Sequence, residues 1–216
     1  MLELYENYAW PYEQALAWMI QAHEDVVQQK RPPLIALGMH SHRVITLGLN
    51  TPESQILAHE TIAKEGIAIH RIERGGGATA HEPGQLVLYP IVPLGYFGDK
   101  GVRIFSARLE DSVIALLKNL GVSASKKCSA PGVFIGEKKI AQLGFRVKSG
   151  VVLHGLAMNI SNNLSTFSLI APCGSFENNA VSLSEINSAE DWDISKLGVK
   201  LISHLVGREK LTSVIR

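Results

Sequence analysis

Cysteine is scarce in this sequence. Only Cys128 and Cys173 occur among its 216 residues, too few for a fold that depends on a framework of disulfides. A disulfide-rich secreted protein is therefore disfavoured, and a cytoplasmic location is expected, where thiols stay reduced. In that compartment each cysteine is either a small buried side chain or a reactive thiol.

Long hydrophobic runs are also missing. The longest apolar stretch, 86–97, contains two prolines and falls short of the roughly 18 uninterrupted apolar residues that suggest a membrane span. Glu3, Glu6 and Glu13 lie among the first apolar residues, which is not the pattern of a secretory signal. The sequence therefore predicts no membrane as a partner.

A strong charge of either sign is the third absence. Lysine and arginine total 21, aspartate and glutamate total 20, and the formal net charge is +1. No overall attraction to nucleic acid or to an anionic membrane is expected from this balance. With 46% hydrophobic residues, the 216 positions have the composition of one globular domain, 1–216, with a substantial core.

Helical and strand-like patterns alternate along the chain. Apolar residues recur at helical spacing or form short β-like runs between glycine and proline breaks. The patterns predict helices over 11–29, 53–65, 106–120, 181–188 and 191–206, and strands over 34–38, 44–48, 66–72, 86–92, 132–135, 139–147 and 151–160. This order indicates an α+β (mixed α/β) fold with a mixed β-sheet and flanking helices, and it leaves open that the last third packs as a small helical appendage.

The most unusual stretch is a glycine-rich loop between the predicted strands 66–72 and 86–92. Gly75, Gly76 and Gly77 follow Arg74 and precede a threonine and a histidine. Three glycines in a row favour unusual backbone angles or a close approach to another group. A ligand site is one interpretation, and a glycine-rich hairpin without a ligand is the other. The spacing of a Walker loop or of a Rossmann motif is absent.

Histidine and cysteine supply the remaining candidates for chemistry. His40 and His42 are spaced to face the same way on a strand, but a third ligand is missing, so no metal site is predicted. Cys173 lies between a proline and a glycine, and Cys128 follows two lysines. Either thiol would need a nearby cation to become nucleophilic, and spacing alone does not choose between them.

Five short blocks occur in a fixed order: Arg74-Gly75-Gly76…Thr79…His81…Pro83-Gly84-Gln85, Pro131-Gly132-Val133, Lys139-Ile140-Ala141…Leu143-Gly144, His154-Gly155-Leu156-Ala157…Asn159 and Pro172-Cys173-Gly174. Together they resemble the octanoyltransferases of lipoate biosynthesis, which are relatives of the lipoate- and biotin-protein ligases. The resemblance spans about 34–184. It implies the fold of the biotin/lipoate protein ligase catalytic domain and a single octanoyltransferase-like domain over 1–216.

The resemblance implies an acyltransferase with a Cys/Lys dyad. Cys173 would take an octanoyl group from acyl carrier protein as a thioester, and Lys139 would lower the pKa of the thiol and move protons. The acyl group would then pass to a lysine of an apo lipoyl domain, in a 2-oxoacid dehydrogenase complex or the glycine-cleavage H protein, as the first step of protein lipoylation. No cofactor is implied besides the octanoyl-acyl carrier protein substrate, and a monomer is expected.

The implied substrate-binding residues lie in the glycine-rich loop and in the two strands after Lys139: Arg74, Gly75, Gly76, Gly77, Ala78, Thr79, Ala80, His81, Gln142, Leu143, Gly144, His154, Gly155, Leu156 and Ala157. His81 is expected to shape the site and to hydrogen-bond a substrate carbonyl. His154 is either part of the site or a packed histidine bonded to backbone. Arg74 is expected to anchor the loop by pairing with a carboxylate.

Two positions depart from the family pattern. A tyrosine usually precedes the loop histidine and a glycine follows it, where this chain has Ala80 and Glu82. Loss of the ring is expected to widen or reshape the pocket, and the carboxylate is expected to repel an anionic ligand or to pair with Arg74. An excess of lysine and arginine over 126–148 is either a docking surface for acidic carrier proteins or an ordinary solvated face.

Two other functions stay open at this point. An ATP-dependent lipoate- or biotin-protein ligase would activate a free acid as an adenylate and would not use Cys173. A non-catalytic acyl-binding module would keep the fold and the pocket without turnover. Without the family resemblance, Lys139 would be read as an ordinary solvated lysine in a strand.

Overall fold

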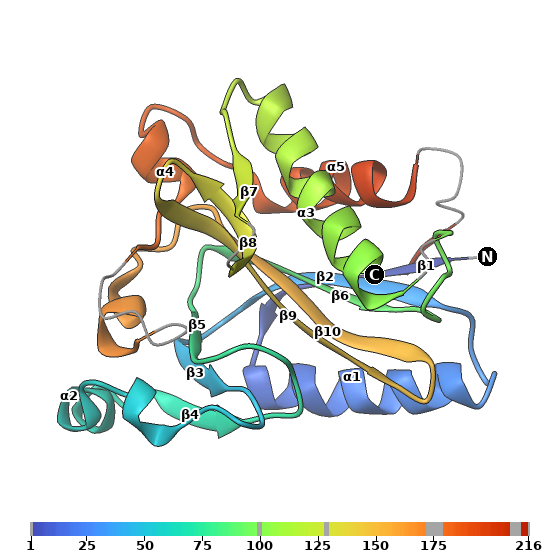
Figure 1. Ribbon diagram of the computed structural model, residues 1–216, viewed down its shortest axis with the longest axis horizontal. Helices are drawn as coiled ribbons and strands as arrows, with labels where there is room; N and C mark the ends of the chain where they lie inside the picture. The colour runs from blue at the N-terminus through green and yellow to red at the C-terminus, as the bar shows by residue number, and fades with distance from the viewer. Residues whose placement is uncertain (1, 99–100, 128–129, 172–178, 208–212, 216) are drawn as a thin grey trace.

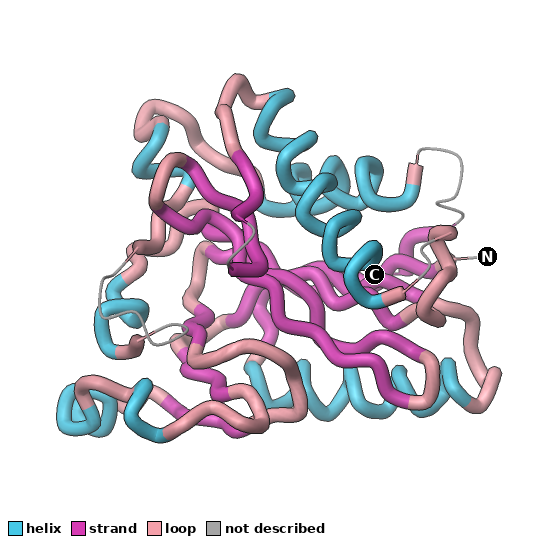
Figure 2. The backbone as a smooth tube through the Cα atoms, in the orientation of Figure 1, coloured by secondary structure: helices cyan, strands magenta, loops and turns pink. Residues whose placement is uncertain are grey.

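Two β-sheets organise the chain in the computed structural model, which describes residues 2–98, 101–127, 130–171, 179–207 and 213–215 (Figure 1). The larger sheet is mixed and has eight strands, in the order β11 (Ser213–Ile215), β1 (Glu3–Trp10), β2 (Leu34–His40), β6 (Gln85–Ile91), β10 (Val151–Asn159), β9 (Lys138–Lys148), β8 (Ala130–Ile135) and β7 (Ser125–Lys127). The smaller sheet has the order β4 (Ala68–Arg71), β3 (Val44–Leu47) and β5 (Thr79–His81). Figure 2 shows the two groups of strands within the surrounding helices.

Helices cover both faces of the larger sheet. The long α1 (Tyr12–Val27) lies along one face, and α3 (Val102–Asn119) and α5 (Ile194–Val206) lie on the other (Figure 1). The apolar stripe of α1 enters one hydrophobic cluster with the sheet, and those of α3 and α5 enter a second, larger one. The predicted α+β class with a mixed sheet and flanking helices is therefore confirmed.

The shorter helical segments lie beside the small sheet or near the end of the chain. They are the 3-10 turns η1 (Glu53–Gln55) and η2 (Ser165–Leu169) and the helices α2 (His59–Lys64) and α4 (Leu183–Ile186). The single helix predicted over 53–65 is wrong, because the chain leaves helical geometry between η1 and α2. There Ile56 forms a β-bridge with Ile170, and the N–H of Ala171 donates to Gln55 O at 2.8 Å.

Residues 2–10 and the described part of the last third are integral to the sheet and its core. Sequence patterns missed β1, which pairs in parallel with β2 and β11. The helical appendage that the sequence left open is excluded, since Leu197, Leu201 and Leu205 of α5 are buried in the same cluster as α3. Of the helices within the described ranges, none combines the length and the apolar content that crossing a bilayer requires.

Strand pairing excludes the glycine-rich hairpin. Strands β4 and β5 are not neighbours: β4 pairs in parallel with one edge of β3, and β5 pairs antiparallel with the other. The segment 72–78 must therefore pass from one edge of β3 to the opposite edge. The small sheet thus presents the glycine-rich loop rather than closing it as a tight turn.

Candidate functional site

The glycine-rich loop forms one wall of a cavity of about 760 Å³. The other walls come from β9, β10, the start of α3, and the residues that precede α4 in the chain. All but one of the predicted substrate-binding residues line it: Arg74, Gly75, Gly76, Gly77, Ala78, Thr79, His81, Gln142, Leu143, Gly144, His154, Gly155, Leu156 and Ala157. The structure therefore brings three sequence blocks, 74–81, 142–144 and 154–157, to one place.

Ala80 is the exception. Side chains alternate along β5, so Thr79 and His81 reach the cavity while Ala80 points the other way. It is fully buried in the cluster behind the loop, with Ile45 and Phe167. The expected widening of the pocket by the missing ring at this position is therefore wrong, because the Ala80 side chain packs behind the wall rather than in it.

Glycines allow the loop to lie directly on β9. The N–H of Gly75 donates to Phe145 O at 3.3 Å. A Cβ on Gly144 would come within 3.1 Å of Gly75 O, and one on Gly48 within 2.1 Å of Gly76 O. Gly76 also has a φ of 86°, which side chains disfavour. Side chains at these positions would push the loop off the strand and change the shape of the cavity.

The loop is held by two polar residues that the sequence patterns did not single out, Thr46 and Gln55. Arg74, which is only 8% exposed, donates to Thr46 O at 2.7 Å, to Thr46 Oγ1 at 2.8 Å and to Gly75 O at 2.9 Å. Gln55 Oε1 accepts from the N–H of Ala78 at 2.7 Å. Thr46 precedes the loop by 28 residues, so only the β3–β5 pairing brings it there.

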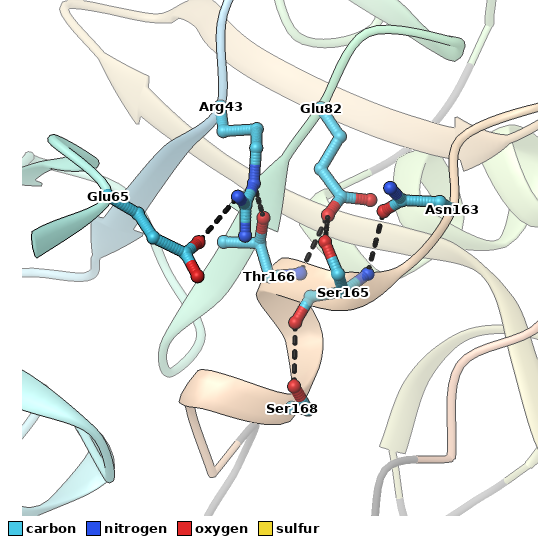
Figure 3. Close-up of polar contacts among 7 residues, drawn as sticks. All are labelled: Arg43, Glu65, Glu82, Asn163, Ser165, Thr166 and Ser168. Carbon is cyan, nitrogen blue, oxygen red and sulfur yellow. Dashed lines mark hydrogen bonds and ion pairs between the residues drawn. The ribbon is translucent and has the colours of Figure 1, made fainter. Parts of the chain in front are cut away.

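Glu82 has a role that the family resemblance did not suggest. Its carboxylate is buried and points at the start of η2 (Figure 3). It accepts from the N–H of Thr166 at 2.7 Å, the N–H of Leu164 at 3.0 Å and Asn162 Nδ2 at 3.0 Å. Glu82 is not part of the cavity wall. The expected pairing with Arg74 and the expected repulsion of an anionic ligand are therefore wrong.

Replacing Glu82 by alanine is expected to lower the free energy of unfolding by about 3–5 kcal/mol, because two buried backbone N–H groups lose their acceptor and Asn162 Nδ2 keeps only Asn159 Oδ1. Urea unfolding followed by circular dichroism measures this loss. Glu65 is the matched control, since it forms an exposed ion pair with Arg43 close to η2, the segment that Glu82 binds (Figure 3). Glu65→Ala should cost at most about 1 kcal/mol, and equal losses in the two variants would contradict the assigned role.

Two buried histidines, His81 and His154, line the cavity, and a third, His40, lies behind His81 with the ring centroids 5.4 Å apart. His40 Nδ1 donates to Trp10 O at 3.1 Å, and its Nε2 accepts from the Tyr89 hydroxyl at 2.8 Å. Burial lowers the pKa of His40 to about 4 and the pKa values of His81 and His154 to about 3. All three rings are neutral near pH 7. Among the described residues no group of three or more His, Cys, Asp or Glu side chains is placed to hold a metal ion.

Hydrogen bonds fix the tautomer of His81. Gln85 Nε2 donates to Ala80 O at 3.2 Å and to Asn159 Oδ1 at 2.9 Å, so Gln85 Oε1 must be an acceptor. His81 Nδ1 lies 2.8 Å from that oxygen and therefore carries the ring proton. The remaining nitrogen, Nε2, is an acceptor. The expected donation from His81 to a substrate carbonyl does not fit this arrangement.

His154 is both a packed residue and part of the cavity wall. It is 5% exposed, and its φ of 60° is rare for a residue with a side chain. Its backbone N–H donates to the sulfur of Met19 at 3.2 Å. The next residue, Gly155, has no room for a side chain, because a Cβ there would lie 2.1 Å from Leu88 O. The distortion of β10 at this point lets consecutive residues line the cavity.

Lys139 also lines the cavity. Its Nζ donates to Pro131 O at 3.0 Å and lies 5.0 Å from the centre of the Phe134 ring. Its backbone binds the chain that leads to α4, with an N–H donated to Asn179 O and a carbonyl that accepts from Val181 at 3.0 Å. Cys173 and Cys128 lie outside the described residues.

The basic excess over 126–148 is partly offset in three dimensions. Lys126 pairs with Asp111 at 2.7 Å and Lys127 with Glu137 at 2.5 Å. Arg146 and Lys148 both approach Glu73, at 2.9 and 3.6 Å. Two acidic residues from outside the segment, Asp111 and Glu73, thus add to the Glu137 already within it.

Comparison with known proteins gives consistent results. The family model described as "Lipoyl protein ligase A/B catalytic domain" matches residues 11–206. An octanoyltransferase of Caldanaerobacter subterraneus subsp. tengcongensis is 34% identical over 177 residues, 82% of this chain and 77% of the relative. Lipoate-protein ligase A bound with ATP superposes with a TM-score of 0.75 at 19% identity, covering all of this chain and 90% of the other. A bipartite lipoate protein ligase of Thermoplasma acidophilum, solved in a study with its E2 lipoyl domain, gives 0.71 at 19% identity, with 100% and 86% covered.

Proposed function

Because the chain belongs to the lipoyl protein ligase A/B catalytic-domain family, we propose that it is an octanoyltransferase that acts in protein lipoylation. Octanoyl-acyl carrier protein is the donor, and a lysine of an apo lipoyl domain, in a 2-oxoacid dehydrogenase complex or the glycine-cleavage H protein, is the acceptor. The name of its octanoyltransferase relative supports the reaction, and the lipoyl domain studied with the Thermoplasma ligase supports the class of acceptor. The residues 1–216 act as one catalytic domain, a cytoplasmic monomer, without a bound cofactor.

The reaction proceeds in two steps through Cys173. The thiolate attacks the thioester of the carrier, and the octanoyl group moves to Sγ while the carrier thiol leaves. A lysine amine then attacks the enzyme thioester, and Sγ leaves as the thiolate. Exchange of one thioester for another conserves the activated acyl bond, so the first step needs no ATP. Lys139 stabilises the thiolate by its charge and moves the protons.

The observation that carries the proposal is an apolar cavity with Lys139 at its wall. Leu143, Leu156 and Ala157 offer apolar contacts to an alkyl chain, and burial of seven chain carbons would contribute about 6 kcal/mol at about 0.8 kcal/mol each. The described chain on both sides of Cys173 adjoins this site. Ala171 donates to the backbone of Gln55, whose side chain holds the glycine-rich loop, and Asn179 lines the cavity.

A turnover assay with matched substrates separates this function from its alternatives. The purified protein is incubated with an apo lipoyl domain and with either octanoyl-acyl carrier protein or free octanoate plus ATP and Mg²⁺. Intact mass spectrometry of the lipoyl domain measures acyl transfer. We expect one octanoyl group on the domain with the carrier donor alone, and none with the Cys173→Ser variant.

Two results would contradict the proposal. Transfer from free octanoate that requires ATP and survives Cys173→Ser would identify a ligase that works through an adenylate. Tight binding of the acyl group without turnover from either donor would identify an acyl-binding module. Cys128→Ser is the control for the choice of thiol, and it should transfer at the wild-type rate.

A further inference from the structure

The cavity contains a hydrogen-bond acceptor that the transfer of an acyl chain does not explain. His81 Nε2 has no hydrogen-bond partner within the described residues, and the His81 side chain lines the cavity. Two other side-chain oxygens of lining residues, Thr79 Oγ1 and Gln142 Oε1, also lack a partner, but protein atoms enclose them, so a ligand in the cavity cannot reach them.

A rigid chain of hydrogen bonds sets the orientation of His81. Asn159 Nδ2 donates to Val181 O at 3.0 Å, which leaves Asn159 Oδ1 to accept from Gln85. Gln85 in turn accepts the proton of His81 Nδ1. Asn159 and Gln85 are fully buried, so neither amide can rotate without losing these partners. As long as these hydrogen bonds are intact, His81 therefore presents an acceptor to the cavity and not a donor.

The chemistry of the substrates shows which group needs acceptors. The octanoyl chain has no N–H or O–H, and its thioester carbonyl is itself an acceptor. The attacking lysine is the one reacting group that brings N–H donors to the carbonyl carbon. An amine can attack only if its lone pair faces that carbon, and acceptors for its N–H bonds would hold it in this orientation.

We propose that His81 Nε2 accepts a hydrogen bond from the amine of the incoming lysine and directs its lone pair at the thioester. This inference rests on the proposed function and assigns His81 to its second step. The amine nitrogen bonds to the carbonyl carbon, the C–S bond breaks, and the electron pair remains on Cys173 Sγ. The proton leaves the nitrogen for that thiolate, or for Lys139 where its amine is neutral.

His81 holds the amine and does not take the proton. Burial and the charge of Arg74 keep the ring neutral, with a pKa of about 3, so it is a poor base near pH 7.

Two substitutions of His81 test its two ring nitrogens separately: the Nδ1 that binds Gln85 and the Nε2 that faces the cavity. Asparagine places an N–H near the position of Nδ1, so it keeps the bond to Gln85 and removes the acceptor from the cavity. Glutamine places an oxygen near the position of Nε2, so it restores the acceptor. Each variant is first loaded with octanoyl groups on Cys173. The acyl-enzyme is then mixed with either an apo lipoyl domain or 2-mercaptoethanol, and its decay is followed by intact mass.

We expect His81→Asn to slow transfer to the lysine about 10- to 100-fold, the effect of one lost hydrogen bond to a charged or strongly polar group. Transfer to the thiol should stay within about threefold, since a thiolate brings no N–H. His81→Gln should recover at least part of the transfer to lysine. Equal slowing with both acceptors, slower loading of Cys173, or unchanged transfer to lysine would overturn the inference.

A spectroscopic test is independent of the acyl-enzyme. In ¹⁵N NMR spectra of the wild-type protein, His81 should show a protonated Nδ1 and a pyridine-type Nε2. Addition of n-butylamine, as a lysine analogue, should move the Nε2 resonance towards lower frequency. Absence of this shift would overturn the inference. If the wild-type protein formed no acyl-enzyme, the proposed function would fail, and the amine titration would still decide whether His81 binds amines.

Discussion

Lys139→Met is expected to lower octanoyl transfer about 10²- to 10⁴-fold, the usual contribution of a group that transfers protons in the transition state. Methionine keeps an unbranched apolar stem that can pack on Phe134, where the lysine Nζ now lies 5.0 Å from the ring centre. The backbone hydrogen bonds of residue 139 to Asn179 and Val181 do not depend on the side chain. The loss should therefore be one of chemistry, measured as initial rates with octanoyl-acyl carrier protein.

Two further variants show whether this loss is specific to Lys139 and whether it comes from its charge or from proton transfer. Lys138 is exposed and adjacent on β9, and its side chain leaves the opposite face of the strand, so Lys138→Met should transfer at about the wild-type rate. Lys139→Arg keeps the positive charge but cannot release a proton near neutral pH. It should therefore retain part of the thiolate reactivity, measured by alkylation of Cys173, and still transfer slowly. A Lys139→Met enzyme within about threefold of the wild-type rate would contradict the assigned role.

Acidification from pH 7 to 5 is expected to remove about 6 kcal/mol from the free energy of unfolding, about 2 kcal/mol for each of three buried histidines. Burial lowers the pKa values of His40, His81 and His154 to between about 3 and 4, against 6.5 for an exposed ring. Below pH 6.5 the unfolded chain binds protons that the folded protein does not. Stability is thus fully present above pH 6.5 and falls as the pH decreases towards 4.

Urea titrations at several pH values test this directly. Between pH 6 and 4.5 the slope of the unfolding free energy against pH should approach about 4 kcal/mol per unit, equivalent to three protons taken up on unfolding. His154→Asn should reduce the uptake by one proton, and asparagine tolerates the positive φ of that position. A slope equivalent to one proton or less in the wild-type protein would show that these rings are not held neutral by burial.

The sequence predicted most elements of the fold, because their patterns are local. Helix α1 and strands β9 and β10 lie within a few residues of the predicted bounds. Strand β1 was missed, since exposed and polar residues interrupt its apolar positions and its stability comes from pairing with β2 and β11. The helix predicted over 53–65 failed for a similar reason: the bridge from Ile56 to Ile170 is a tertiary contact that local patterns do not contain.

At the candidate site, too, the sequence predicted what local motifs contain and missed what depends on tertiary contacts. Fourteen of the fifteen binding residues that the motif blocks predicted line the cavity, and the exception, Ala80, depends on which face of β5 turns inward. Thr46, Gln55 and Glu82 were missed or misread because each acts on a segment that is distant in the sequence or recognisable only in the fold. The alternation of β5, Thr79 and His81 inward and Ala80 outward, was the one local signal that could have identified the exception.

The central claim is that Cys173 carries the acyl group between donor and acceptor. The most direct measurement is a single incubation of the protein with octanoyl-acyl carrier protein in the absence of an acceptor, followed by intact mass and peptide mapping. We predict one added octanoyl group on the peptide that contains Cys173, released by hydroxylamine and by an apo lipoyl domain. An unmodified Cys173 in a preparation that still octanoylates the lipoyl domain would contradict it.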